Sequence, residues 1–84
     1  MSLNLISTKW VDTKSLHWIE AMTSGNDGAL IFAVRSPFGE CLNKSLQMVP
    51  EPLPSNRDAR FLHTCRFAEF GHAASALKKY LDSL

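Results

Sequence analysis

Long apolar runs and a strong net charge are both missing from this sequence of 84 residues. The longest apolar run, residues 29–34, is far shorter than the roughly 20 residues that a membrane-spanning helix needs. Residues 1–6 also lack the basic start and the long apolar stretch of a secretory signal. The formal net charge of +1 gives no general attraction to nucleic acid or to an anionic membrane. We therefore expect a cytoplasmic protein with no membrane partner.

Cysteine is scarce, and the two that are present, Cys41 and Cys65, lie far apart in the sequence. Small secreted domains usually carry several disulfides, so we expect both side chains to be free thiols. His63 and Cys65, with Cys41 and His72, contain the atoms of a metal site or of an activated thiolate. Zinc sites, however, use cysteine pairs separated by about two to four residues, and this sequence has no such pair. The pattern predicts no metal site, and it predicts that Cys65 is a small buried side chain.

Catalytic signatures are absent as well. No Gly-x-Ser-x-Gly motif presents a nucleophilic serine, and the glycines at positions 25, 28, 39 and 71 are too scattered to form a phosphate-binding loop. The carboxylates stand alone in the sequence rather than in recognisable pairs, and isolated surface acids are usually solvated. The sequence therefore predicts a protein that is not an enzyme and that carries no cofactor.

The sequence does have the composition of an ordinary globular domain, with 45% apolar and 20% charged residues. A chain of this length is expected to form one domain, residues 1–84, and to bury only about 60 to 65% of its unfolded surface. Its core should therefore be thin. Three prolines make residues 50–56 a semi-rigid loop, because proline removes amide donors and biases the preceding residue to extended geometry. Such a loop is also a segment that partners can contact.

Alternating apolar residues predict strands over residues 15–23, 29–35 and 40–49. For residues 15–23 a short helix is the competing interpretation, since the apolar residues there also fall on one helical stripe. Residues 29–35 are apolar on both faces, which is typical of a central strand. Turn-forming residues at 24–28 and 36–39 separate the three segments and predict hairpins between them.

The last third of the chain predicts a strand followed by a helix. Residues 60–67 alternate so that His63 and Cys65 share a face with the two phenylalanines, whereas the two arginines lie on the opposite face. We expect the phenylalanine face to be buried. From residue 71 to residue 83 apolar side chains recur every three or four positions, as in an amphipathic helix. Together these elements predict the α+β class: an antiparallel sheet of three or four strands with the C-terminal helix packed on one face.

Basic side chains concentrate in the C-terminal third, where residues 57–84 carry five Lys and Arg against three Asp and Glu. A small antiparallel sheet backed by one helix resembles, in fold plan alone, the sheet-type DNA-binding domains such as the arm-binding domains of integrases. That resemblance implies nucleic-acid binding. The candidate contacts are Arg35, Arg57, Arg60, Arg66, Lys78 and Lys79. The competing interpretation is a solvated face with ordinary charge pairs, such as Lys78 with Asp82.

Three bulky aromatic residues, Trp10, Trp18 and Phe38, have no clear place in so thin a core, and Leu53 on the proline-rich loop completes the candidate interaction surface. The two tryptophans could cap the open end of the sheet as core residues. If they are exposed instead, the four residues would offer a surface to an unknown protein partner or to a second copy in a homodimer. Edge strands of a small sheet favour self-association in the same way. The leading prediction is therefore a non-enzymatic accessory or regulatory interaction module, with nucleic-acid binding as the alternative.

Overall fold

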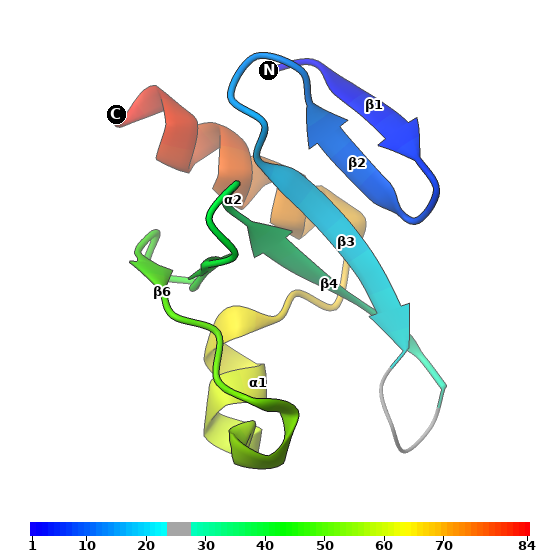
Figure 1. The fold of residues 1–84 in the computed structure, drawn as a ribbon, viewed down its shortest axis with the longest axis vertical. Helices are drawn as coiled ribbons and strands as arrows, with labels where there is room; N and C mark the ends of the chain where they lie inside the picture. The colour runs from blue at the N-terminus through cyan, green and yellow to red at the C-terminus, as the bar shows by residue number, and fades with distance from the viewer. Residues whose placement is uncertain (24–27) are drawn as a thin grey trace.

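The computed structural model describes residues 1–23 and 28–84 (Figure 1). In this part of the chain six strands form one antiparallel sheet in chain order, and a short 3-10 helix and two α-helices follow them. Figure 1 shows α2 against β4, and α1 at the end of the molecule opposite the two chain termini. The elements are β1 (Leu3–Ile6), β2 (Lys9–Asp12), β3 (Trp18–Thr23), β4 (Leu30–Arg35), β5 (Cys41–Leu42), β6 (Met48–Val49), η1 (Pro54–Asn56), α1 (Ala59–Cys65) and α2 (Phe70–Asp82).

The N-terminal hairpin of β1 and β2 adds two strands that the sequence pattern did not predict. Ser7, in the turn between them, has a φ of 60°, the left-handed conformation that tight hairpin turns often require. β2 then pairs with β3 from Lys9 opposite Glu20 to Val11 opposite Trp18. Each of the two added strands has only four residues, which is too short for a clear alternation.

The central ladder joins β3 and β4 through six residue pairs, from Trp18 opposite Arg35 to Thr23 opposite Leu30. It confirms the strand predicted over residues 29–35. It also confirms a strand rather than a helix within residues 15–23, although residues 15–17 belong to the preceding loop. β4 has three consecutive buried residues, as expected of a central strand. The turn predicted at 24–28 lies, apart from Gly28, outside the described residues.

The single strand predicted over residues 40–49 is wrong, because this segment folds back on itself. β5 and β6 pair with each other, and residues 43–47 form the turn between them. Asn43 holds the reversal: its side-chain oxygen accepts hydrogen bonds from the amides of Ser45 at 2.9 Å and Gln47 at 3.0 Å. Asparagine favours turns through such bonds to nearby backbone amides. This local hydrogen bonding outweighs the apolar alternation.

The strand predicted over residues 60–67 is also wrong, since α1 occupies most of it. Asp58 caps this helix by accepting a hydrogen bond from the amide three residues later at 2.8 Å. The chain returns to extended geometry at Arg66, and Phe67 then bridges Phe32 through two backbone hydrogen bonds of 2.8 Å. Alternation over so short a segment is compatible with either structure. The cap at Asp58 favours the helix.

The helix changes which side chains in residues 60–67 are buried. Cys65 and Phe67 are buried, as predicted, whereas His63 is exposed. Arg66, which alternation placed on the opposite, exposed face, is only 4% exposed. The cause is geometric, because side chains follow a helical period up to Cys65 and an extended one only after it.

The C-terminal helix closes the core and confirms the predicted fold class. The prediction of residues 71–83 matches α2, whose buried residues Ala73, Ala76 and Leu77 face the sheet. Alanine at two of these positions lets the helix backbone come close to the strands. The result is an α+β protein with an antiparallel sheet covered on one face by α2. The buried cluster consists of Ile19, Phe32, Val34, Leu42, Phe67, Ala73, Ala76 and Leu77.

Candidate functional site

Glu51 lies at the centre of three arginines that come from different parts of the chain. Its carboxylate forms ion pairs with Arg35 of β4 and with Arg66, and it lies 3.9 Å from Nε of Arg57. Arg66 also donates from Nη1 to the carbonyl oxygen of Cys65 at 3.0 Å. This Glu51 cluster joins the loop after β6 to the central strand and to the end of α1.

Burial and neighbouring charges together set the protonation states around Glu51. Burial alone would raise the pKa of Glu51, but hydrogen bonds and positive charge from Arg66 and Arg35 outweigh it and lower that pKa below its ordinary value. Burial raises the pKa of the nearby Cys41 thiol to about 11, and the charge of Glu51 adds to the effect. At neutral pH the carboxyl is therefore ionised and Cys41 is a thiol. Neither group has the pKa near neutrality that suits a general acid or base.

Ion pairing reduces the positive charge available to nucleic acid. Four of the six predicted contacts are held in ion pairs: Arg35, Arg57, Arg66 and Lys78. The partner of Lys78 is Asp82, as predicted, with Nζ and Oδ2 2.8 Å apart. Arg60 and Lys79 are exposed and take part in no ion pair with the described residues. Nucleic-acid binding stays a prediction that this arrangement does not favour.

The four predicted interaction residues do not form one surface. Trp10 packs on the first residue of α2, with ring centroids 4.8 Å apart, and is half-buried at the end of the core. Trp18 lies on the other face of the sheet. Trp10 pairs with Ile19 and shares its face, and consecutive residues such as Trp18 and Ile19 point to opposite faces. Phe38, in the turn after β4, is 89% exposed, and Leu53, in the loop after β6, is 69% exposed.

Glu20 organises the open face of the sheet, the face opposite α2. It accepts a hydrogen bond from the indole Nε1 of Trp18 at 3.2 Å. Its carboxylate also lies 3.5 Å from Nε of Arg35 and 3.9 Å from Nζ of Lys9. The Lys9 ammonium in turn lies 5.2 Å from the ring centroid of Trp18, a cation–π distance. These contacts hold Trp18 in place and give both cations a carboxylate partner.

The β1 edge of the sheet is uncharged and, apart from Asn4, apolar. β1 consists of Leu-Asn-Leu-Ile, without charge or proline, and β2 is its only partner among the described strands. Leu5 and Ile6 are each 60% exposed. Natural sheets usually protect an edge with charge, proline, a bulge or a covering segment, because unpaired backbone groups there can pair with another chain. β1 therefore presents the features of a strand-pairing site.

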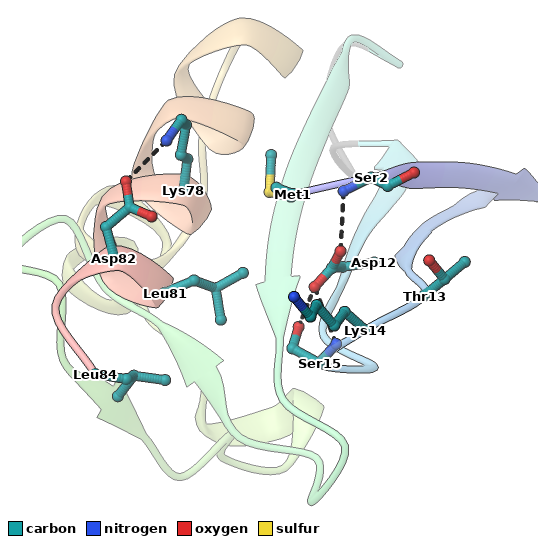
Figure 2. A pocket seen from close by; sticks show the side chains of 10 residues that line it. All are labelled: Met1, Ser2, Asp12, Thr13, Lys14, Ser15, Lys78, Leu81, Asp82 and Leu84. Carbon is teal, nitrogen blue, oxygen red and sulfur yellow. Dashed lines mark hydrogen bonds and ion pairs between the residues drawn. The ribbon is translucent and has the colours of Figure 1, made fainter.

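A cavity of about 700 Å³ lies between the N-terminal hairpin and the end of α2 (Figure 2). Asp12 is buried beside it and accepts hydrogen bonds from the amides of Ser2 and Ser15, each at 3.0 Å, and from the Ser15 hydroxyl. These hydrogen bonds lower the pKa of Asp12 to about 2, and the bond from the Ser15 hydroxyl has the largest effect on that pKa. Figure 2 shows the Lys78–Asp82 pair on the opposite wall. Asp12 is thus an anchor for the hairpin, and the charges around the cavity are of both signs.

Sequence reasoning missed the carboxylates that organise these regions. Glu51 bonds to arginines 15 and 16 positions away, a separation that no periodic pattern reports. Glu20 acts across three neighbouring strands, so its role depends on their register. For Asp12 a signal exists, because aspartate commonly bonds to polar groups a few residues later in a turn, here Ser15.

Comparison with protein-family models, with curated proteins and with solved structures finds no match for this chain. Neither α-helix in the described ranges is long and apolar enough to cross a membrane. Within residues 1–23 and 28–84, no three His, Cys, Asp or Glu side chains come together as metal ligands would. The function has to be argued from the surfaces described above.

Proposed function

We propose that this protein is a small non-enzymatic interaction module that pairs with another chain through β1, and that the partner is a second copy of itself. The β1 edge supports this proposal, because it is mostly apolar, uncharged and paired on one side only within the described sheet. Strand addition supplies main-chain hydrogen bonds for affinity, and the exposed Leu5 and Ile6 supply apolar surface. The two free thiols support the cytoplasm as the proposed compartment.

Symmetry dictates how two copies would meet. Antiparallel pairing of β1 with its copy uses a twofold axis perpendicular to the sheet, so residues of equal parity lie opposite one another. Leu3 and Leu5 would continue into the leucines of the second strand on the α2 side, and Asn4 and Ile6 would do so on the open face. Such an interface closes at the dimer and uses up the free edge. An interface based on four-residue strands is small, so we expect weak and concentration-dependent association.

Sedimentation across a range of protein concentrations tests this proposal. The wild-type protein should shift from monomer to dimer as its concentration rises, and Leu5→Lys should raise the dissociation constant by at least about tenfold, because edge lysines oppose pairing. Leu53→Lys is the matched control, since it adds the same charge at an exposed leucine outside the sheet. It should leave the dissociation constant unchanged. Asn4→Lys, at an exposed residue of the same strand, repeats the test with a milder change.

A protein that stays monomeric up to millimolar concentration would contradict the proposal. Equal effects of Leu5→Lys and Leu53→Lys would contradict it too, because they would show a general charge effect rather than edge pairing. Circular dichroism of each variant confirms that the fold is retained.

A further inference from the structure

A small basic cavity lies where the turn between β5 and β6 meets α2. Its volume is about 270 Å³. The turn contributes a lysine and a leucine, and α2 contributes an imidazole, a hydroxyl, a methyl group and a second lysine. No carboxylate lines it. The residues are Lys44, Leu46, His72, Ser75, Ala76 and Lys79.

The α2 side of the cavity presents its polar groups in a row. His72, Ser75 and Lys79 are separated by three and four positions, so they lie on one face of the helix about one turn apart. Ala76 lies between Ser75 and Lys79 in the sequence. Its side chain is buried and contributes only a methyl group. The row therefore offers several hydrogen-bond donors around an apolar floor.

The turn that carries Lys44 is fixed by contacts with α1 and with the core. The Lys44 amide donates to the carbonyl oxygen of Thr64 at 2.9 Å, which ties the turn to the last part of α1. Leu46 has a φ of 63°, a left-handed conformation that is unfavourable for leucine, and its side chain packs against the core. A strained residue of this kind persists only where the surroundings impose it. Contacts within the chain thus hold this wall of the cavity.

No carboxylate of the described residues neutralises the two lysines of the cavity, although Nζ of Lys44 lies 6.0 Å from the ring centroid of Phe67, the outer limit of a cation–π contact. Neither Lys44 nor Lys79 forms an ion pair with the described residues, whereas the adjacent Lys78 is paired with Asp82. The carboxylate of Glu69 lies 3.7 Å from Nε2 of His72, but it is not among the lining groups. The cavity therefore carries an excess of positive charge on a protein whose net charge is only +1.

We propose that this cavity binds the phosphate group of a small phosphorylated molecule. Ammonium groups, an imidazole and a hydroxyl are the donors that a phosphate oxyanion accepts from, and charge-assisted bonds of this kind are the stronger ones. The volume is close to the lower end of ligand pockets, about 300 Å³, which suits a phosphate with a small attached group. The site is separate from β1, so it goes beyond self-association and does not depend on it.

Nuclear magnetic resonance titration with inorganic phosphate and with glycerol phosphate tests the site at constant pH and constant ionic strength. The signals of the His72 ring and of the neighbouring amides should shift and saturate with both ligands. Lys44→Gln and Lys79→Gln should each weaken binding by about three- to tenfold, since each removes one exposed charge-assisted contact. Lys78→Gln is the matched control and should leave the affinity unchanged. All three positions are exposed, so the fold should be retained.

Three results would overturn the proposal. The first is an equal response to chloride, which would show general screening. The second is equal weakening by Lys78→Gln, which would show that the position of the charge does not matter. The third is much tighter binding of a short oligonucleotide that depends on Arg60 rather than on Lys44, which would assign the surface to nucleic acid instead.

Discussion

The two edges of the sheet are built in opposite ways. β6 has two residues and is followed by Pro50, and the Glu51 cluster fastens the loop after it to β4 and to Arg66. β1 has four residues, no charge, no proline and two largely exposed apolar side chains. A short edge strand and a proline are common ways to protect an edge, and β6 has both, whereas β1 is longer and has no proline. We call the β6 side the covered edge, because the Glu51 cluster fastens the loop that follows it.

The difference also shows how a thin core is supplemented. At the covered edge the Glu51 carboxylate, with a side chain only 9% exposed, and its arginines add ion pairs to the packing of side chains such as Leu42. A buried ion pair is compatible with a stable fold only while both charges are present, because a single charge left in the interior is strongly destabilising. We therefore expect changes near β6 to act on folding, and changes at β1 to act on association.

The largest expected effect is that of Glu51→Gln, which breaks the covered edge. Removing the charge leaves Arg66, with a side chain only 3% exposed, without its carboxylate. The free energy of unfolding should fall by about 3 kcal/mol. Urea denaturation measures it. The control is Glu69→Gln, the same change in an exposed pair with His72, which should leave the unfolding midpoint nearly unchanged.

The same variant should alter the response to acid. The pKa of Glu51 is lowered in the folded protein, so its contribution is complete above the unfolded-state pKa and is lost as the pH falls through the folded-state pKa. Asp12, with a pKa lowered to about 2, adds to the loss in the same direction. Stability should fall from roughly pH 5 downwards, and less steeply in Glu51→Gln. Parallel curves for the two proteins would show that this carboxyl is not linked to folding.

A matched pair of leucine truncations compares the two edges directly. Leu42, in β5 beside the covered edge, is fully buried, whereas Leu5 in β1 is 60% exposed. Leu42→Ala should lower the free energy of unfolding by about 2 to 3 kcal/mol, because it leaves a cavity. Leu5→Ala should change it by less than about 0.5 kcal/mol. Thermal and urea unfolding of both variants test the comparison, and similar losses at the two positions would contradict it.

The smallest effect concerns the thiols of the covered edge. Cys41 and Cys65 are buried, and burial raises the pKa of Cys41 to about 11, so little thiolate is exposed at neutral pH. A thiol reagent should therefore label the native protein slowly and the urea-unfolded protein at once. Glu51→Gln should label faster than wild type, because it loosens this edge. Immediate labelling of the native protein would show that the edge is open.

Prediction from sequence worked for the two central strands and for the C-terminal helix. β3 and β4 pair with each other over their whole length, and α2 keeps a period of about 3.6 over thirteen residues. It failed over residues 40–49 and 60–67. In the first segment Asn43 accepts a hydrogen bond from a nearby amide and stabilises a turn, and before the second Asp58 caps a helix in the same way. One well-placed hydrogen bond of this kind stabilises a turn or a helix start by as much as the strand preference of a few alternating residues opposes it. An apolar alternation therefore does not by itself decide the structure of such a segment.

For the functional surfaces the sequence supplied candidates without their arrangement. Phe38 and Leu53 are exposed, as an interaction role requires, but the two tryptophans lie on opposite faces of the sheet. Arg66, expected among solvent-facing charges, is buried against Glu51. The small basic cavity combines Lys44 with His72, Ser75 and Lys79 of α2. Nothing in the sequence spacing of Lys44 and these residues indicates that they meet.

By itself the sequence determined the α+β class, the two central strands, the C-terminal helix and the absence of strong net charge, because these follow from local periodicity and composition. The tertiary structure alone decided which arginines are neutralised, which edge strand is followed by a loop fastened through ion pairs, and where lysines without a carboxylate partner gather. The physical reason is distance along the chain. Glu51 and its partners are 15 and 16 residues apart, and their energies depend on burial that exists only once the sheet and helices have packed.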